Sequence, residues 1–237
     1  MTGGRAGRRA GPSLLGLPYR LTWVLAFLLG LGPLMRWVVL IATNGLGANP
    51  VEFLTRSSGR WALIVLLVAL AMTPLARLTR QAGFIRLRRM AGLFAFFYVC
   101  LHLMTYVWWD QWFDPAKIAA DIWKRPFITA GFAAFLLLLP LAVTSTKGWV
   151  RRLGGANWQR LHRAVYVAAP LAVLHLWWIR AGKNDFRDPG IFLAVLAVLL
   201  GWRLVMRWRR ERAAAPDFLT QRPMPRTSTS ISSGPDA

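Results

Sequence analysis

Long apolar runs, separated by short polar and basic segments, dominate the pattern of this 237-residue chain. The hydrocarbon core of a bilayer is about 30 Å thick, and about 20 helical residues cross it. None of the runs alternates apolar with polar residues, as the strands of a membrane barrel would. The pattern therefore predicts six transmembrane helices. They are Leu21–Ile41, Trp61–Ala76, Met90–Trp109, Phe127–Val143, Leu161–Ile179 and Ile191–Met206.

These spans predict an all-α, polytopic membrane bundle of six helices, because backbone groups in lipid must form their hydrogen bonds within the chain. Three regions are expected along the sequence. Residues 1–20 form a basic cytoplasmic N-terminus, residues 21–210 the transmembrane domain, and residues 211–237 a tail. The tail is rich in Pro, Ser and Thr, a composition typical of disorder.

Charge predicts the orientation of the bundle. The net charge is +21, and 21 of the 30 Lys and Arg residues fall in the segments on the side that holds both chain ends. The opposite segments hold eight. This bias is the positive-inside pattern, so both termini are expected in the cytoplasm and the protein in the bacterial inner membrane. Basic loops that face anionic headgroups explain the high charge, and nucleic-acid binding is not expected.

Several motifs are absent from the sequence, and this reduces the classes of protein that the chain is expected to belong to. Cys100 is the only cysteine, so no internal disulfide forms. We find no phosphate-binding glycine loop, no cysteine cluster of metal-binding type, and no stretch outside the membrane long enough for a nucleotide-binding domain. A self-contained ferric reductase or NADPH oxidase would need such a domain. The chain also lacks the paired carboxylates or activated nucleophile of a catalytic site, which favours a non-catalytic subunit.

The three histidines are the candidates for chemistry, because all lie in or at the edge of a predicted span. An intramembrane histidine is a functional candidate, since an unpartnered imidazole in lipid is costly. His102 and His175 lie on helices three and five, which run in the same direction. Each stands roughly 18–20 Å beyond the cytoplasmic charges, at 1.5 Å per residue. Two histidines at one level can both bind one haem iron.

His162 lies near the cytoplasmic face, roughly 19.5 Å from His175 along the helix. A second haem at its level would need a partner on helix three, where no histidine is found. At the same surface, arginines are candidates to pair with haem propionates or a flavin phosphate, because guanidinium binds such oxyanions in bidentate fashion. These are Arg88, Arg89, Arg151 and Arg152. The competing interpretation for them is simple membrane anchoring.

From about Pro18 to about Arg210 the sequence resembles the MsrQ (YedZ) family of ferric-reductase-like membrane proteins. The resemblance rests chiefly on RRMAGLFAFFYVCLHLMTY (88–106) and RRLGGANWQRLHRAVYVAAPLAVLHLWW (151–178), which contain all three histidines. It implies a b-type haem protein, with one or two haems and with FMN as a further cofactor. It also implies that electrons from quinol or a cytoplasmic flavin reductase pass to MsrP, a periplasmic molybdopterin enzyme that reduces methionine sulfoxide.

One alternative of another class stays open at this point. A helical transporter, or another membrane protein without haem, could use the histidines for proton transfer or for structure. Transporters usually show broken helices or repeated halves, and the sequence contains neither convincingly. An absorption spectrum of the purified protein distinguishes the two functions.

Overall fold

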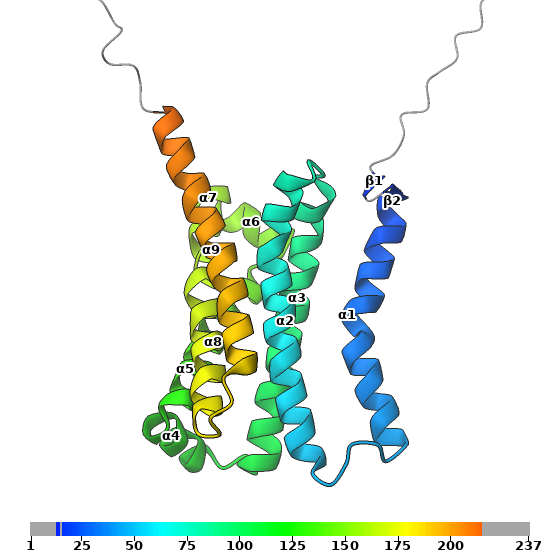
Figure 1. Cartoon of the computed structure of the whole chain (residues 1–237), viewed down its shortest axis with the longest axis vertical. Coiled ribbons are helices and arrows are strands. Elements are labelled where there is room, and N and C mark those ends of the chain that lie inside the picture. Colours follow the sequence, from blue (N-terminus) through cyan, green and yellow to red (C-terminus); the bar gives the residue numbers. More distant parts are fainter. Residues whose placement is uncertain (1–12, 15, 215–237) are drawn as a thin grey trace, which may run out of the picture.

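The computed structural model describes residues 13–14 and 16–214 and is built almost wholly of helices (Figure 1). Its twelve elements are β1 (Ser13–Leu14), β2 (Leu17–Pro18), α1 (Tyr19–Ala42), α2 (Pro50–Leu78), α3 (Gly83–Thr105), the π-helical turn η1 (Tyr106–Asp110), α4 (Pro115–Lys124), α5 (Pro126–Val143), α6 (Lys147–Leu153), α7 (Gly155–His162), α8 (Val165–Ala181) and α9 (Arg187–Ala214).

The prediction of six membrane-spanning helices is confirmed. Six segments of the described chain are long and apolar enough to cross a bilayer, and each contains one predicted run. Helices α2 and α9 exceed their predicted lengths most, and α3 begins at Gly83, seven residues before the predicted Met90. Helix α2 begins at Pro50, where the Asn49 side chain accepts a hydrogen bond from the Glu52 backbone N–H and caps the helix. Helix α9 continues to Ala214, past the predicted domain boundary at 210. The tail predicted to be disordered otherwise lies outside the described residues.

The fifth predicted span differs from the expectation in one detail. It is made of two helices, α7 and α8, which are separated at Arg163 and Ala164. Backbone N–H groups at this break bond to carbonyls three residues earlier, as in Ala164 to Leu161 at 3.0 Å. Such bonds make a tighter turn than those of an α-helix. His162 therefore ends α7, whereas His175 lies within α8.

The helices pack as two antiparallel pairs that share a core. Helix α2 lies along α3, and α5 lies along α8, while α9 covers α8 and α2 (Figure 1). The buried residues of these five helices form one apolar cluster around Leu66, Leu70 and Ala168. Helix α1 stands apart and meets α3 at a few points, among them the Tyr98 hydroxyl, which donates to the Gly30 carbonyl at 2.5 Å. Most of its surface is exposed, as expected for a helix that faces lipid.

The bundle has two distinct ends (Figure 1). One holds helix α4 and the loops 43–49 and 182–186, and we call it the α4 end. There Asp114 caps α4, and its hydrogen bond from the Lys117 backbone N–H lowers the pKa of the Asp114 carboxyl. The other holds α6, α7 and the last turns of α9, and we call it the α7 end. Both described chain ends, Ser13 and Ala214, lie at the α7 end, as an even number of spans requires.

Candidate cofactor site

His102 and His175 come together inside the bundle, in its half nearer the α4 end. His102 lies one turn before the end of α3, and His175 lies in the second half of α8. The centroids of the two imidazole rings are 6.0 Å apart, and the ring planes meet at 75°. The chain thus brings two nitrogen ligands from different helices to one level of the membrane.

Each ring is held by a hydrogen bond through Nδ1. The Nδ1–H of His102 donates to the Thr55 carbonyl of α2 at 2.9 Å, and that of His175 donates to the Phe127 carbonyl of α5 at 2.6 Å. A carbonyl oxygen only accepts, so Nδ1 must carry the proton in both rings. In a neutral imidazole this leaves the lone pair on Nε2. A backbone carbonyl on the far nitrogen is the usual means of orienting a histidine that binds a metal.

A glycine makes room for each ring, at the same spacing in both helices. Gly59 follows Thr55 by four residues, and Gly131 follows Phe127 by four. A side-chain carbon at Gly59 would lie 3.0 Å from the His102 ring, and one at Gly131 would lie 2.7 Å from Nδ1 of His175. Helices α2 and α5 therefore hold the two histidines in the same way: one carbonyl accepts from the ring, and a glycine one turn later contacts it.

The spacing of the rings suits a shared iron. A metal–imidazole nitrogen bond is about 2 Å long, so two rings on opposite sides of one metal have their centroids roughly 6 Å apart. The 75° angle between the ring planes does not prevent both rings from binding one metal, because each ring can turn about its metal–nitrogen bond. Among the described residues, no group of three or more His, Cys, Asp or Glu side chains could hold a metal ion. The pair is thus suited to a metal that brings its other ligands with it.

The histidines line a cavity of about 1270 Å³ between α2, α3, α5, α8 and the start of α9. This volume exceeds the roughly 300–1,000 Å³ of ordinary small-molecule sites, so a group as large as haem can be accommodated. The inner wall is apolar, with Leu66, Leu138 and Phe192 among its residues. The Thr55 hydroxyl also lines the cavity, and this buried oxygen has no hydrogen-bond partner within the described structure.

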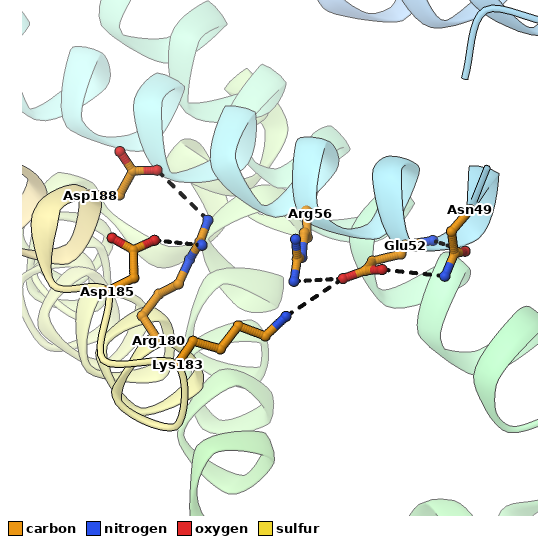
Figure 2. A network of polar contacts seen from close by, with 7 residues as sticks. All are labelled: Asn49, Glu52, Arg56, Arg180, Lys183, Asp185 and Asp188. Carbon is orange, nitrogen blue, oxygen red and sulfur yellow. Dashed lines mark hydrogen bonds and ion pairs between the residues drawn. The ribbon is translucent and has the colours of Figure 1, made fainter. Parts of the chain in front are cut away.

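Basic side chains gather where this cavity reaches the α4 end. They are Arg36, Arg56, Arg60, Arg125, Arg180 and Lys183. Figure 2 shows three of them in a network of ion pairs that joins the first turns of α2 to the α8–α9 loop. Glu52 pairs with Arg56 at 2.6 Å, and Arg180 pairs with Asp185 at 2.9 Å. Partly exposed pairs of this kind are worth about 1 kcal/mol or less, so an incoming carboxylate can compete for the cations.

The structure does not bring His162 to this site. The His162 ring stacks on Trp158, with centroids 3.8 Å apart, and its Nδ1 donates to the Trp158 carbonyl at 3.0 Å. Its Nε2 is buried and has no hydrogen-bond partner among the described residues. Arg88 interacts electrostatically with the ring. The four predicted arginines are at the α7 end, and none lines the large cavity. Arg88 is half-buried, while Arg89, Arg151 and Arg152 are exposed.

Several groups at the site escape prediction from sequence. Thr55 and Phe127 act through backbone carbonyls, which leave no trace in residue identity. Gly59 and Gly131 lie within apolar helices, where a glycine indicates a close contact but does not identify the group that it contacts. The cations at the α4 end contribute only to the predicted topology, although their position beside the ends of α2, α5 and α8 is a usable signal.

Comparison with known proteins identifies the family. Residues 58–173 match the family described as "Ferric reductase like transmembrane component". A Bordetella pertussis protein named "Protein-methionine-sulfoxide reductase heme-binding subunit MsrQ" is 58% identical over 190 residues, covering 80% of this chain and 92% of its own length. The chain belongs to the MsrQ family. A Herminiimonas arsenicoxydans MsrQ is 52% identical over 196 residues, covering 82% of this chain and 90% of its own.

Membership in the MsrQ family confirms the resemblance found in the sequence. A Rhodospirillum rubrum MsrQ aligns over 86% of this chain and 97% of its own length, at 51% identity. The likeness thus extends over nearly the whole length of each of these three MsrQ proteins. The ferric-reductase match includes His102 and His162, and both glycines that contact the cavity histidines. Together with the six helices, these comparisons establish a multi-pass membrane protein with a ferric-reductase-like bundle.

Proposed function

We propose that this chain is a haem-binding electron-transfer subunit that serves a periplasmic reductase of protein methionine sulfoxide. The observation that carries the proposal is the His102–His175 pair. Two imidazoles from parallel helices lie 6.0 Å apart in one large cavity, each with Nδ1 committed to a carbonyl. The relatives' name, haem-binding subunit of a protein-methionine-sulfoxide reductase, supports the choice of haem and of the reductase system.

A b-type haem held by His102 and His175 would supply one-electron redox chemistry. The chain's own residues do the rest. The Thr55 and Phe127 carbonyls keep Nε2 of each ring available as a ligand. The apolar wall of α2, α3 and α5 keeps water from the buried side of the site. Reduction of methionine sulfoxide would belong to the partner, in keeping with the relatives' name of haem-binding subunit.

The haem carboxylates would face the basic side chains of the α4 end. Arg56, Arg60 and Arg180 lie in or beside the ion-pair network there, and they line the same cavity as the histidines. Arginine binds carboxylates in bidentate fashion, and the acids that now pair with these cations are partly exposed. Arg88, Arg89, Arg151 and Arg152 are left as candidates for a group at the α7 end, such as a second haem near His162 or the phosphate of FMN.

The direction of electron flow follows from orientation, which we propose from the charge bias. The α7 end carries the excess of Lys and Arg and would face the cytoplasm. Electrons from quinol or a cytoplasmic flavin reductase would enter there, and the haem near the α4 end would pass them to a periplasmic MsrP-type molybdopterin enzyme.

Reporter fusions test this orientation. Fusions after Ala48 and Lys183, in the loops of the α4 end, are expected to read periplasmic. Fusions after Gln81 and Gly155, in the connections at the α7 end, are expected to read cytoplasmic. The reverse assignment would place the haem on the donor side of the membrane and contradict the proposed direction.

Reconstitution tests the function itself. The purified chain in nanodiscs, supplied with a reductant, is expected to show no turnover of protein methionine sulfoxide. Adding a periplasmic MsrP-type reductase is expected to start turnover, and each cycle reoxidises the haem, which the absorption spectrum follows. Turnover by the chain alone would show that it carries a catalytic site of its own and would overturn the assignment as an electron-transfer subunit.

A further inference from the structure

A second, smaller cavity of about 290 Å³ lies at the α7 end, where α9 crosses the end of α2 beside α8. It is separate from the histidine site and shares no lining residue with it. Its charged lining residues are all basic: Arg77, Arg203, Arg207 and Arg210. The three arginines of α9 follow a spacing of four and three residues, so they form one stripe along the helix.

Arg203 is held at this cavity by a backbone carbonyl of α2 that a proline leaves without its helical partner. Pro74 has no backbone N–H, so the Leu70 carbonyl, four residues earlier, loses its partner within the helix. Nη2 of Arg203 donates to that carbonyl at 2.8 Å. Nη1 donates to the Tyr166 hydroxyl of α8, and the guanidinium lies over the Tyr166 ring. The guanidinium is thus held in a set orientation before any ligand arrives.

Two buried donors at the cavity have no acceptor. Nε of Arg203 and Nε1 of Trp202 are both inaccessible to solvent, and neither has a hydrogen-bond partner in the described part of the chain. A buried N–H without a partner costs about 1–3 kcal/mol, so an acceptor from outside the described residues that reached either donor would stabilise it.

Within the described residues, the arginines of this cavity have no acidic partner. All seven ion pairs found within residues 13–14 and 16–214 lie at the α4 end. None includes Arg77, Arg203, Arg207 or Arg210. Glu211 is the one acidic residue of the described chain at the α7 end, and it does not line the cavity.

We propose that this cavity binds the phosphate group of an anionic membrane phospholipid. Arginine side chains bind phosphate oxygens in bidentate fashion, and the four arginines of this cavity form no ion pair within the described residues. The membrane is the source because Leu204 and Met206 also line the cavity, and Leu204 is 53% exposed on the lipid-facing surface of α9. Basic pockets between transmembrane helices are known sites for anionic headgroups.

Native mass spectrometry with a matched pair of variants tests the site. Arg207→Gln with Arg210→Gln removes two charges from the cavity. Arg209→Gln with Arg212→Gln removes two charges from the same helix end, at exposed residues that do not line it. Each protein is titrated with phosphatidylglycerol against a phosphatidylcholine background. We expect the cavity variant to retain phosphatidylglycerol at least about tenfold more weakly, and the control variant to bind like the native protein.

Two results would overturn this assignment. Equal weakening in both double variants would mean that diffuse charge, rather than the cavity, holds the lipid. Displacement of phosphatidylglycerol by sodium phosphate, but not by sodium chloride of equal ionic strength, would assign the site to a soluble phosphate compound. Survival of the bound lipid in excess phosphate supports the membrane source, because acyl-chain contacts then add to those of the headgroup.

Discussion

Replacing His102 or His175 by alanine is expected to abolish the low-spin haem spectrum of the protein. Either change would leave the proposed haem with one histidine ligand in an apolar cavity, and no other histidine can reach the site, since His162 lies at the opposite end. Loss of groups that merely orient a metal ligand costs about 10–100-fold in affinity, so loss of the ligand itself should cost more. Haem content per protein, measured after purification, gives the result.

His162→Ala is the matched control for this prediction. It removes the third imidazole but leaves the cavity and both of its carbonyl contacts intact. The low-spin spectrum of the cavity haem should persist in this variant, while electron entry slows if an inner haem or flavin depends on His162. Loss of all haem from His162→Ala, with none lost from His102→Ala, would refute the pairing of His102 with His175.

Gly131→Ala is expected to weaken haem binding by about 10–100-fold without destabilising the helix that carries it. The new methyl carbon would lie 2.7 Å from Nδ1 and 2.8 Å from Cε1 of His175, closer than such atoms pack. The ring must shift, and its hydrogen bond to the Phe127 carbonyl breaks. Alanine is the better helix former by about 1 kcal/mol, so α5 itself should not suffer.

Gly92→Ala supplies the control, because a side-chain carbon at Gly92 of α3 meets nothing within 4 Å. It should raise helix propensity equally and leave haem content unchanged. Gly59→Ala should have a smaller effect than Gly131→Ala, since its nearest contact with the His102 ring is 3.0 Å. Haem affinity is measured by titrating the apoproteins in detergent, with thermal unfolding recorded alongside. A normal affinity in Gly131→Ala would mean that the orientation of His175 does not matter.

The six-helix membrane bundle can be predicted from the sequence because each span depends only on the residues within it. Each span needs only enough apolar residues to cross the bilayer, so Leu21–Ile41 and Phe127–Val143 correspond closely to α1 and α5. The common level of His102 and His175 also follows, since a helix rises by a constant amount per residue from its basic end. Counting residues from the basic end of each helix thus predicts a common level for two rings whose centroids are 6.0 Å apart in the structure.

What sequence could not supply is contact between helices distant in the chain. The carbonyls of Thr55 and Phe127 are 47 and 48 residues from the rings that they hold, and backbone groups carry no signal in residue identity. The break between α7 and α8 also escaped prediction. It falls at Arg163 and Ala164, neither of which is a typical helix-breaking residue. The proline of that span, Pro170, lies inside α8. The hydrogen bond from Arg203 to the Leu70 carbonyl depends in the same way on Pro74 in another helix.

The central claim is that His102 and His175 together occupy both axial positions of one haem. The most direct measurement is the absorption spectrum of the purified, dithionite-reduced protein before and after carbon monoxide. The account predicts a six-coordinate, low-spin spectrum that carbon monoxide leaves unchanged, and a carbon monoxide complex if any haem is retained in His175→Ala. A native protein without a Soret band, or one whose entire Soret band shifts on adding carbon monoxide, would contradict it.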